Sequence, residues 1–324
     1  MGKIISLDKI ISFSPYIELS IRWFYWRIIS QISILNIFRN KNIKSKKNTF
    51  DFDDAIIFFK KNGIKSDDII LVHSSYKELK NSGKSPIEII EQLKGLVNNG
   101  TLVMPSIRKF SNDPNTKNYL KHDYKDEVTN FDVYKSPVIT GALPSAMLNR
   151  LDANISLFPL NNLVAIGKHS EQMMQGNLDG ELPTPCGINS AWKYCLENNA
   201  YIIGLGIELA SCLTMIHTIE DCLDEKWPIK DWYRERKFKI IKNNYSELKT
   251  IRERKPIWGS LHWAGRTLAK DLVKNNIVKS ILINGVIIEI ISSKELAIFL
   301  NSKNINGYPY FCLNNKLKKI NVFS

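Results

Sequence analysis

The sequence contains few of the features that mark several common protein classes. Its five cysteines are an odd number without a CxxC pair, which argues against a disulfide framework and a zinc ribbon. No GxGxxG or Walker loop is present, so the usual signatures of dinucleotide and nucleotide binding are missing. We find no cleavable signal peptide, internal repeat or low-complexity segment. A cytoplasmic protein without a bound metal is therefore expected.

Charge is plentiful but unevenly distributed along the 324 residues. Residues 1–50 carry a net charge of +7, residues 51–225 a net charge of −7, and residues 226–324 a net charge of +13. Basic ends suit an anionic partner such as phosphate groups or a membrane surface, whereas an acidic centre suits a cationic substrate. A solvated basic surface explains the same numbers equally well, and no nucleic-acid partner is expected.

Residues 1–50 are interpreted as a basic amphipathic extension of the main domain. Residues 17–38 are apolar and aromatic, but Glu18, Arg22 and Arg27 interrupt them. A spanning helix needs ~20 predominantly apolar residues, and charges inside it are costly. Two alternatives remain. A helix packed on the core, or on a second subunit of a homodimer, is favoured. The other is peripheral contact of residues 17–47 with the inner membrane face, with the basic run 39–47 as a second attachment.

Residues 51–324 are predicted to form one layered α/β domain, because strands and helices of similar length alternate along the chain. Apolar runs predict strands at 68–73, 101–105, 163–167 and 201–206, and helical spacing predicts helices at 54–62, 86–97 and 140–148. Asn284-Gly285 predicts a two-residue turn in a hairpin over 281–291, followed by a helix at 294–301. Residues 108–136 are predicted to be a long loop. In residues 226–255 only the high charge is evident.

The best catalytic candidate lies in residues 201–225, which predict a strand, a tight loop at Gly204 and Gly206, and a helix capped by Ser211. On that helix Thr214, His217 and Glu220 are three residues apart and share one face. A histidine oriented by a carboxylate can accept a proton near neutral pH. An ordinary helix pair is the competing interpretation of His217 and Glu220.

Five stretches in the same order resemble the aminoglycoside 3-N-acetyltransferase family over about residues 55–225. A strand ends in V-H-S-S at residues 72–75, and T-L-V-M-P follows at 101–105. An F-D stretch at 131–132 leads through S-P at 136–137 into G-A-L-P at 141–144. P-C-G at 185–187 is followed by Ser190 and Trp192, and a glycine strand end is followed by T-x-x-H-x-x-E at 214–220. Each motif is weak alone, but the ordered set is specific.

This resemblance implies a mixed α/β fold and acetyl transfer from acetyl-CoA to an amine of an amino sugar. It implies that His73, Ser74, Ser75 and Ser106 contribute to holding the cofactor, although His73 is equally well explained as a core histidine. The family's general base is a histidine in an H-P-x-H-S stretch, and here residues 158–162 read F-P-L-N-N. Asn161 stands at the position of the base, and an amide cannot accept a proton at neutral pH.

The loss of that histidine leaves three interpretations. His217 is the base, with Glu220 and Thr214 as its partners; the acceptor arrives as a neutral amine; or the chain no longer acetylates and is a binding protein. Asn161 and Asp221 are expected to contact the acceptor. Cys186 suggests an acyl-cysteine, but no base is paired with it in the sequence, so a buried thiol is favoured. Trp192 is expected in the core.

The expected function is therefore acetyl-CoA-dependent N-acetylation of a small-molecule amino sugar, with surface-polysaccharide biosynthesis as the favoured setting. The basic ends and the amphipathic N-terminus favour an anionic, lipid- or nucleotide-linked acceptor. The acidic centre favours the alternative, an aminoglycoside-modifying enzyme that confers antibiotic resistance.

Overall fold

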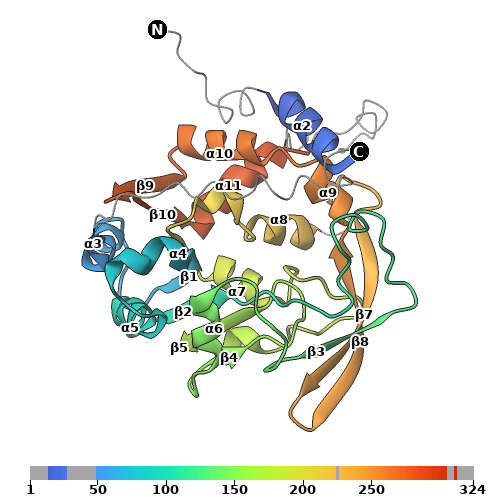
Figure 1. Ribbon diagram of the computed structural model, residues 1–324, viewed down its shortest axis with the longest axis horizontal. Coiled ribbons are helices and arrows are strands. Elements are labelled where there is room, and N and C mark those ends of the chain that lie inside the picture. The colour runs from blue at the N-terminus through green and yellow to red at the C-terminus, as the bar shows by residue number, and fades with distance from the viewer. Residues whose placement is uncertain (1–13, 28–48, 224–225, 305–309, 312–324) are drawn as a thin grey trace.

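A seven-stranded mixed sheet forms the centre of the computed structural model, which describes residues 14–27, 49–223, 226–304 and 310–311 (Figure 1). The strand order is β4-β5-β2-β1-β6-β10-β9. Strand β1 is parallel to β2 and β6, whereas β5 and β10 run antiparallel to their neighbours. The strands are β1 (Ile69–Ser74), β2 (Thr101–Pro105), β4 (Asn154–Ile155), β5 (Leu163–Gly167), β6 (Tyr201–Leu205), β9 (Val278–Ile283) and β10 (Val286–Ser292).

Helices cover both faces of this sheet, so that its strands are buried on both sides. Ile70 and Val72 of β1 belong to the core shared with α3 (Phe52–Lys61), α5 (Pro86–Leu96) and α6 (Ala142–Leu148). Ile69 and Leu71 belong to the opposite core, which includes α7 (Ala191–Glu197), α8 (Ile216–Leu223), α10 (Gly265–Lys274) and α11 (Ser293–Asn304). Burial on both faces explains why these strands are continuous apolar runs.

The expected elements of the main sheet are confirmed within one or two residues at most ends. Ser85 begins α5 with a reciprocal capping box, in which its hydroxyl accepts from the Glu88 N–H and the Glu88 carboxylate accepts from the Ser85 N–H. Asn284 and Gly285 join β9 to β10 with φ of 47° and 88°, the left-handed pair that a tight hairpin needs. The final predicted helix is α11.

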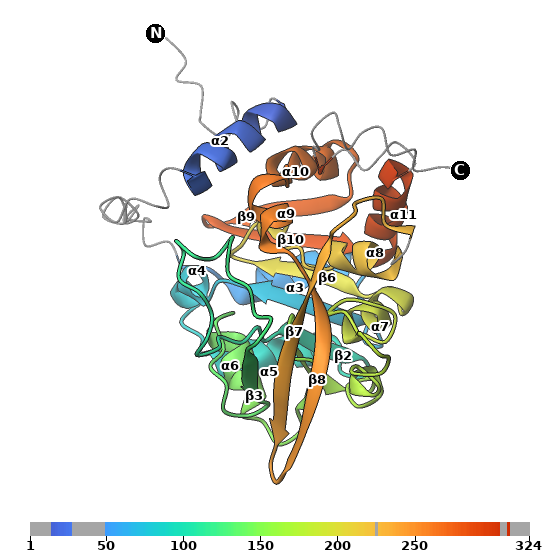
Figure 2. The same ribbon diagram turned by 90° about the vertical axis from the view of Figure 1, so that its right-hand side faces the viewer.

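A second, three-stranded sheet corrects the expectation of a long loop over 108–136. Within that segment β3 (Val128–Asp132) pairs in parallel with β7 (Tyr233–Lys242), which forms a ten-residue hairpin arm with β8 (Tyr245–Arg254). Figure 2 shows this hairpin extending past the main sheet. Phe131, Phe238 and Ile251 lie in its own small core. A strand of five residues between polar loops has too short an apolar pattern to stand out in the sequence.

The N-terminal segment is helical where it is described. Helix α2 (Pro15–Arg27) packs on α9 (Pro256–Leu261) and α10, outside the main layers (Figures 1 and 2). The Glu18 carboxylate accepts from the N–H groups of Arg266 and Thr267 at the start of α10. Residues 15–27 thus pack on the domain through one side of α2, as the first alternative expects, and residues 28–48 lie outside the described part. None of the described helices is long and apolar enough to cross a membrane.

Candidate active site

The motif residues meet at one edge of the main sheet. The parallel strands β1, β2 and β6 end at this edge, and β5 begins there, since Pro105 pairs with Leu163. His73 and Ser74 therefore lie near the segment that precedes β5. At Gly206, just after β6, φ is +68° and an added Cβ would lie 2.8 Å from Glu78 Cβ, so only glycine fits this turn. Carboxyl ends of parallel strands are the usual place for a ligand site.

The three serines expected to hold the cofactor differ in how accessible their hydroxyls are. Ser74 and Ser75 are half-buried at the end of β1, and their hydroxyls have no hydrogen bond to any described residue. Both hydroxyls are therefore available to a ligand at this edge. Ser106 is different, because it is fully buried and its hydroxyl donates to Asn162 Oδ1 at 2.7 Å. The expected contact of Ser106 with the cofactor does not fit this geometry.

His73 is a buried histidine whose Nε2 has no hydrogen-bond partner among the described residues. Burial lowers its pKa to about 4, so the ring is neutral. Its centroid lies 6.4 Å from that of Trp192, which is also buried, as expected. Trp192 Nε1 in turn donates to the backbone oxygen of Asn161 at 2.7 Å. His73 thus lies inside the wall of the site and is connected through Trp192 to the segment before β5.

The start of α8 corrects one part of the expected catalytic face and confirms another. Residues 209–211 form a separate 3-10 turn in which the Ser211 hydroxyl donates to Glu208, and α8 begins only at Ile216. Thr214 therefore precedes the helix, and its hydroxyl faces the backbone oxygen of Cys212 at 3.4 Å. His217 and Glu220 do pair: His217 Nδ1 lies 2.7 Å from Glu220 Oε2. Thr214 thus lies outside the helix that carries this pair.

Burial lowers the pKa of His217, and the nearby Arg254 acts in the same direction, while Glu220 opposes the shift. Arg254 also contacts Glu220, at 3.6 Å. A neutral His217 that donates from Nδ1 to the carboxylate carries its lone pair on Nε2. His217 is 20 % exposed and no described residue bonds to Nε2, so that atom can accept a proton.

A chain of contacts joins Asn161 to the second sheet. Asn161 Nδ2 lies 3.5 Å from the Cys186 thiol, and the Cys186 N–H donates to Asp221 Oδ2 at 3.0 Å. The Tyr233 hydroxyl donates to Asp221 Oδ1 at 2.9 Å. Burial raises the pKa of Asp221 to about 7, against the effect of both hydrogen bonds. Asn161 has φ of +45°, a conformation that asparagine tolerates better than most residues.

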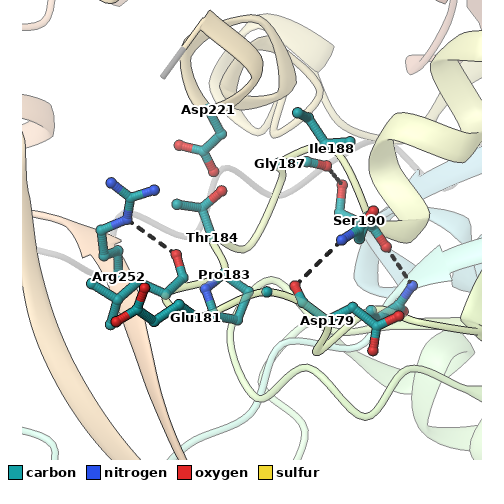
Figure 3. A pocket seen from close by; sticks show the side chains of 13 residues that line it. Asp179, Glu181, Pro183, Thr184, Gly187, Ile188, Ser190, Asp221 and Arg252 are labelled. Atoms are coloured by element: carbon teal, nitrogen blue, oxygen red, sulfur yellow. Dashed lines mark hydrogen bonds between the residues drawn. The ribbon is translucent and has the colours of Figure 1, made fainter. Parts of the chain in front are cut away.

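A cavity of about 390 Å³ opens beside Asp221 (Figure 3). Carboxylates of Asp179, Glu181 and Asp221 line it, and among the described residues the Arg252 guanidinium is the cation beside them. The Arg252 Nε donates to the backbone oxygen of Leu182 at 3.1 Å, which fixes the guanidinium on the rim. The remaining lining includes Thr184, Ile188 and Ser190, from the P-C-G motif region. An acidic cavity thus lies next to the helix that carries His217.

The family model described as aminoglycoside 3-N-acetyltransferase matches residues 71–302, more than two thirds of the chain. The chain belongs to this family. It is accordingly an acetyl-CoA-dependent N-acetyltransferase by class, with acetyl-CoA as co-substrate. No curated protein matches the sequence significantly.

Solved aminoglycoside acetyltransferases share the fold. AAC(3)-IVa as the apoenzyme has a TM-score of 0.61 and 19% identity, covering 83% of this chain and 94% of its own. AAC-IIIb in a binary complex with CoASH has a TM-score of 0.63 and 16% identity, with coverage of 80% and 97%. AAC-VIa bound to sisomicin has a TM-score of 0.63 and 14% identity, with coverage of 80% and 99%. The mixed α/β fold expected from the resemblance is confirmed.

Three residues of the candidate site come from a region where the sequence shows little beyond charge. The Tyr233 hydroxyl of β7 donates to Asp221. On β8, Arg252 lines the cavity and Arg254 contacts Glu220. The signal that could have found them is the alternation of Phe238 and Ile240 with lysines, which is typical of a half-buried strand. The pattern does not predict that side chains of this hairpin contact α8.

Proposed function

We propose that this enzyme transfers the acetyl group of acetyl-CoA to an amine of a polycationic amino sugar of the aminoglycoside kind. The observation that carries the proposal is the cavity beside Asp221, where three carboxylates face one fixed guanidinium. A polycationic acceptor would gain favourable charge interactions there, and its ammonium groups would favour the ionised form of Asp221. Relatives of the same fold have been solved with sisomicin, a gentamicin and apramycin.

His217 is proposed as the general base. The attacking amine must first lose the proton of its ammonium form, and His217 Nε2 is the available acceptor. The adjacent Glu220 would stabilise the imidazolium that results, because the carboxylate lies 2.7 Å from Nδ1. Asp221, which lines the cavity, lies four residues after His217, so the proposed base and Asp221 share one side of α8.

Bound acetyl-CoA supplies the thioester whose acetyl group the amine takes. Ser74 and Ser75 would hold its arm, since both hydroxyls are available at the end of β1. Asn161 is proposed to line the reaction site through its half-buried side chain rather than to move a proton.

An acceptor screen scored by thiol release from acetyl-CoA tests this function. Sisomicin and apramycin are expected to support release, with a KM that rises with ionic strength because the attraction is electrostatic. In the Glu181→Gln variant the KM for the acceptor should rise roughly threefold to tenfold, while the KM for acetyl-CoA stays constant. Glu197→Gln, which removes an exposed carboxylate outside the cavity, is the matched control.

A second candidate is N-acetylation of an amino sugar in surface-polysaccharide biosynthesis. The net charges of +7 and +13 in the terminal segments favour it, since nucleotide- or lipid-linked sugars are anionic. Thiol release with nucleotide-linked amino sugars but not with sisomicin would establish this candidate and refute the first. A titration that detects no binding of acetyl-CoA would refute both and leave a binding protein.

A further inference from the structure

Helix α2 displays an aromatic face that the described part of the domain leaves exposed. Trp23 is 53% exposed and Phe24 is 50% exposed. They lie five and six residues after Glu18, and hence on the side of the helix turned away from that residue. Arg27 is exposed one turn after Trp23. Large aromatic side chains gathered on one exposed face are uncommon in monomeric proteins unless they meet a partner.

The orientation of this face is fixed by the opposite side of α2. Glu18 is 2% exposed, and its carboxylate accepts from Arg266 N–H at 3.0 Å and from Thr267 N–H at 3.3 Å. Arg22 donates to the same carboxylate at 3.1 Å. A carboxylate at the first turn of α10 satisfies its unpaired N–H groups and interacts favourably with the helix dipole. The domain therefore holds Trp23 and Phe24 outward.

The chemistry of this face fits a lipid surface. Trp is enriched where membrane and water meet, and arginine can extend its charge toward headgroups from the same depth. The chain that follows α2 adds charge complementarity: residues 28–48 carry five Lys/Arg and no Asp/Glu. Basic segments next to an apolar anchor favour anionic lipids.

We propose that the Trp23–Phe24 face of α2 docks this protein on the surface of an anionic membrane, independently of which acceptor it acetylates. The helix lies flat on the lipid, with its aromatic side chains in the headgroup region and its Glu18 side on α10. The active-site edge of the main sheet is formed by other elements, so docking through α2 does not change the residues proposed for acetyl transfer.

Flotation of the full-length protein with vesicles of phosphatidylcholine alone, or with 30% phosphatidylglycerol (roughly the anionic range in which basic segments bind), tests the proposal. The wild type should float with the anionic vesicles only. The double variant Trp23→Ser/Phe24→Ser should lower the partition coefficient by roughly tenfold or more, because two aromatic side chains no longer leave water. Leu248→Ser/Ile87→Ser removes two similarly exposed apolar side chains elsewhere and should bind like the wild type.

Unfolding curves verify that both double variants keep the fold. Equal flotation of the wild type and Trp23→Ser/Phe24→Ser would overturn the proposal and assign binding to the basic segment alone. A wild type that fails to float but forms a concentration-dependent dimer, lost in Trp23→Ser/Phe24→Ser, would overturn it in favour of a second copy of the chain.

Discussion

His217 Nδ1 lies 2.7 Å from Glu220 Oε2, within α8 and beside the acidic cavity. This pair offers both a proton acceptor and a group that stabilises the acceptor once charged. Asn161, at the position where the family has a histidine, offers neither, since an amide cannot accept a proton at neutral pH. The proposed chemistry of this acetyltransferase thus depends on the α8 pair.

Replacing His217 with alanine should lower kcat/KM for acetyl transfer by roughly 10²- to 10⁴-fold, the usual contribution of a general base. Acetyl-CoA binding should remain, because His217 is not among the residues proposed to hold it. Calorimetric titration and thiol release measure the two effects separately. His122→Ala, which removes another histidine paired with a carboxylate, is the control and should keep full activity. Wild-type turnover in His217→Ala would refute the assignment.

The pH dependence of kcat/KM should report the lowered pKa of His217. Activity falls as the base becomes protonated, so the acid-side inflection is expected below pH 6.5, the ordinary value. Glu220 raises the pKa of His217, so the inflection should move to lower pH in Glu220→Gln. Arg254 lowers this pKa, so the inflection should move to higher pH in Arg254→Met. Glu220 and Arg254 also shift the pKa of Asp221, so these two variants alone do not tell the two groups apart. An inflection that persists in Asp221→Asn assigns it to His217.

The parts of the fold that could be predicted are those whose pattern is local and strongly apolar. Strands β1, β2 and β6 are buried on both faces and flanked by polar turns, so their sequences stand out. The β7–β8 hairpin could not be recognised by the same criterion. The exposed Lys237 and Lys239 alternate with the buried Phe238 and Ile240. The segment therefore looks charged rather than apolar in the sequence.

In the candidate site, too, the local contacts could be predicted and the long-range contacts could not. The His217–Glu220 contact spans three residues of one helix, so spacing predicts it. With Ser211 as its cap the helix was expected to begin at residue 212, four residues before α8 does, because the Ser211 hydroxyl bonds back to Glu208 in a 3-10 turn instead of capping α8. Asp221 meets the Cys186 backbone across 35 residues of sequence. Contacts of that range depend on how the two sheets and α8 pack, which no local pattern contains.

Cys186 should be dispensable for turnover. Its side chain is fully buried, and burial raises the pKa of its thiol well above the usual value, so the nucleophilic thiolate is disfavoured. Cys186→Ala is expected to keep kcat within a few-fold of the wild type and to lose roughly 1 kcal/mol of unfolding free energy through the small cavity it leaves. Cys195→Ala, at another fully buried thiol, is the matched control. Loss of turnover in Cys186→Ala alone would instead favour an acyl-cysteine.

Asp221 should make the stability of this enzyme depend on pH near neutrality. Its pKa is about 7 in the fold and 3.8 without the fold's influence, so the folded state holds an extra proton between these values. The stability from this group is fully present below pH 3.8 and is lost as pH rises through 7. Between pH 5.5 and pH 8 the loss amounts to about 2 kcal/mol of unfolding free energy.

Urea unfolding of the wild type and Asp221→Asn at these two pH values measures that loss. The buried His73, whose pKa is lowered to about 4, changes stability in the opposite direction, since its contribution is present above pH 6.5 and lost as pH falls. The comparison is therefore the difference between the two proteins at each pH, in which the His73 contribution cancels. Asp221→Asn should gain relative to the wild type at pH 8. An identical difference at both pH values would show that Asp221 is ionised throughout, and the acidic cavity would then carry one more full negative charge at pH 5.5.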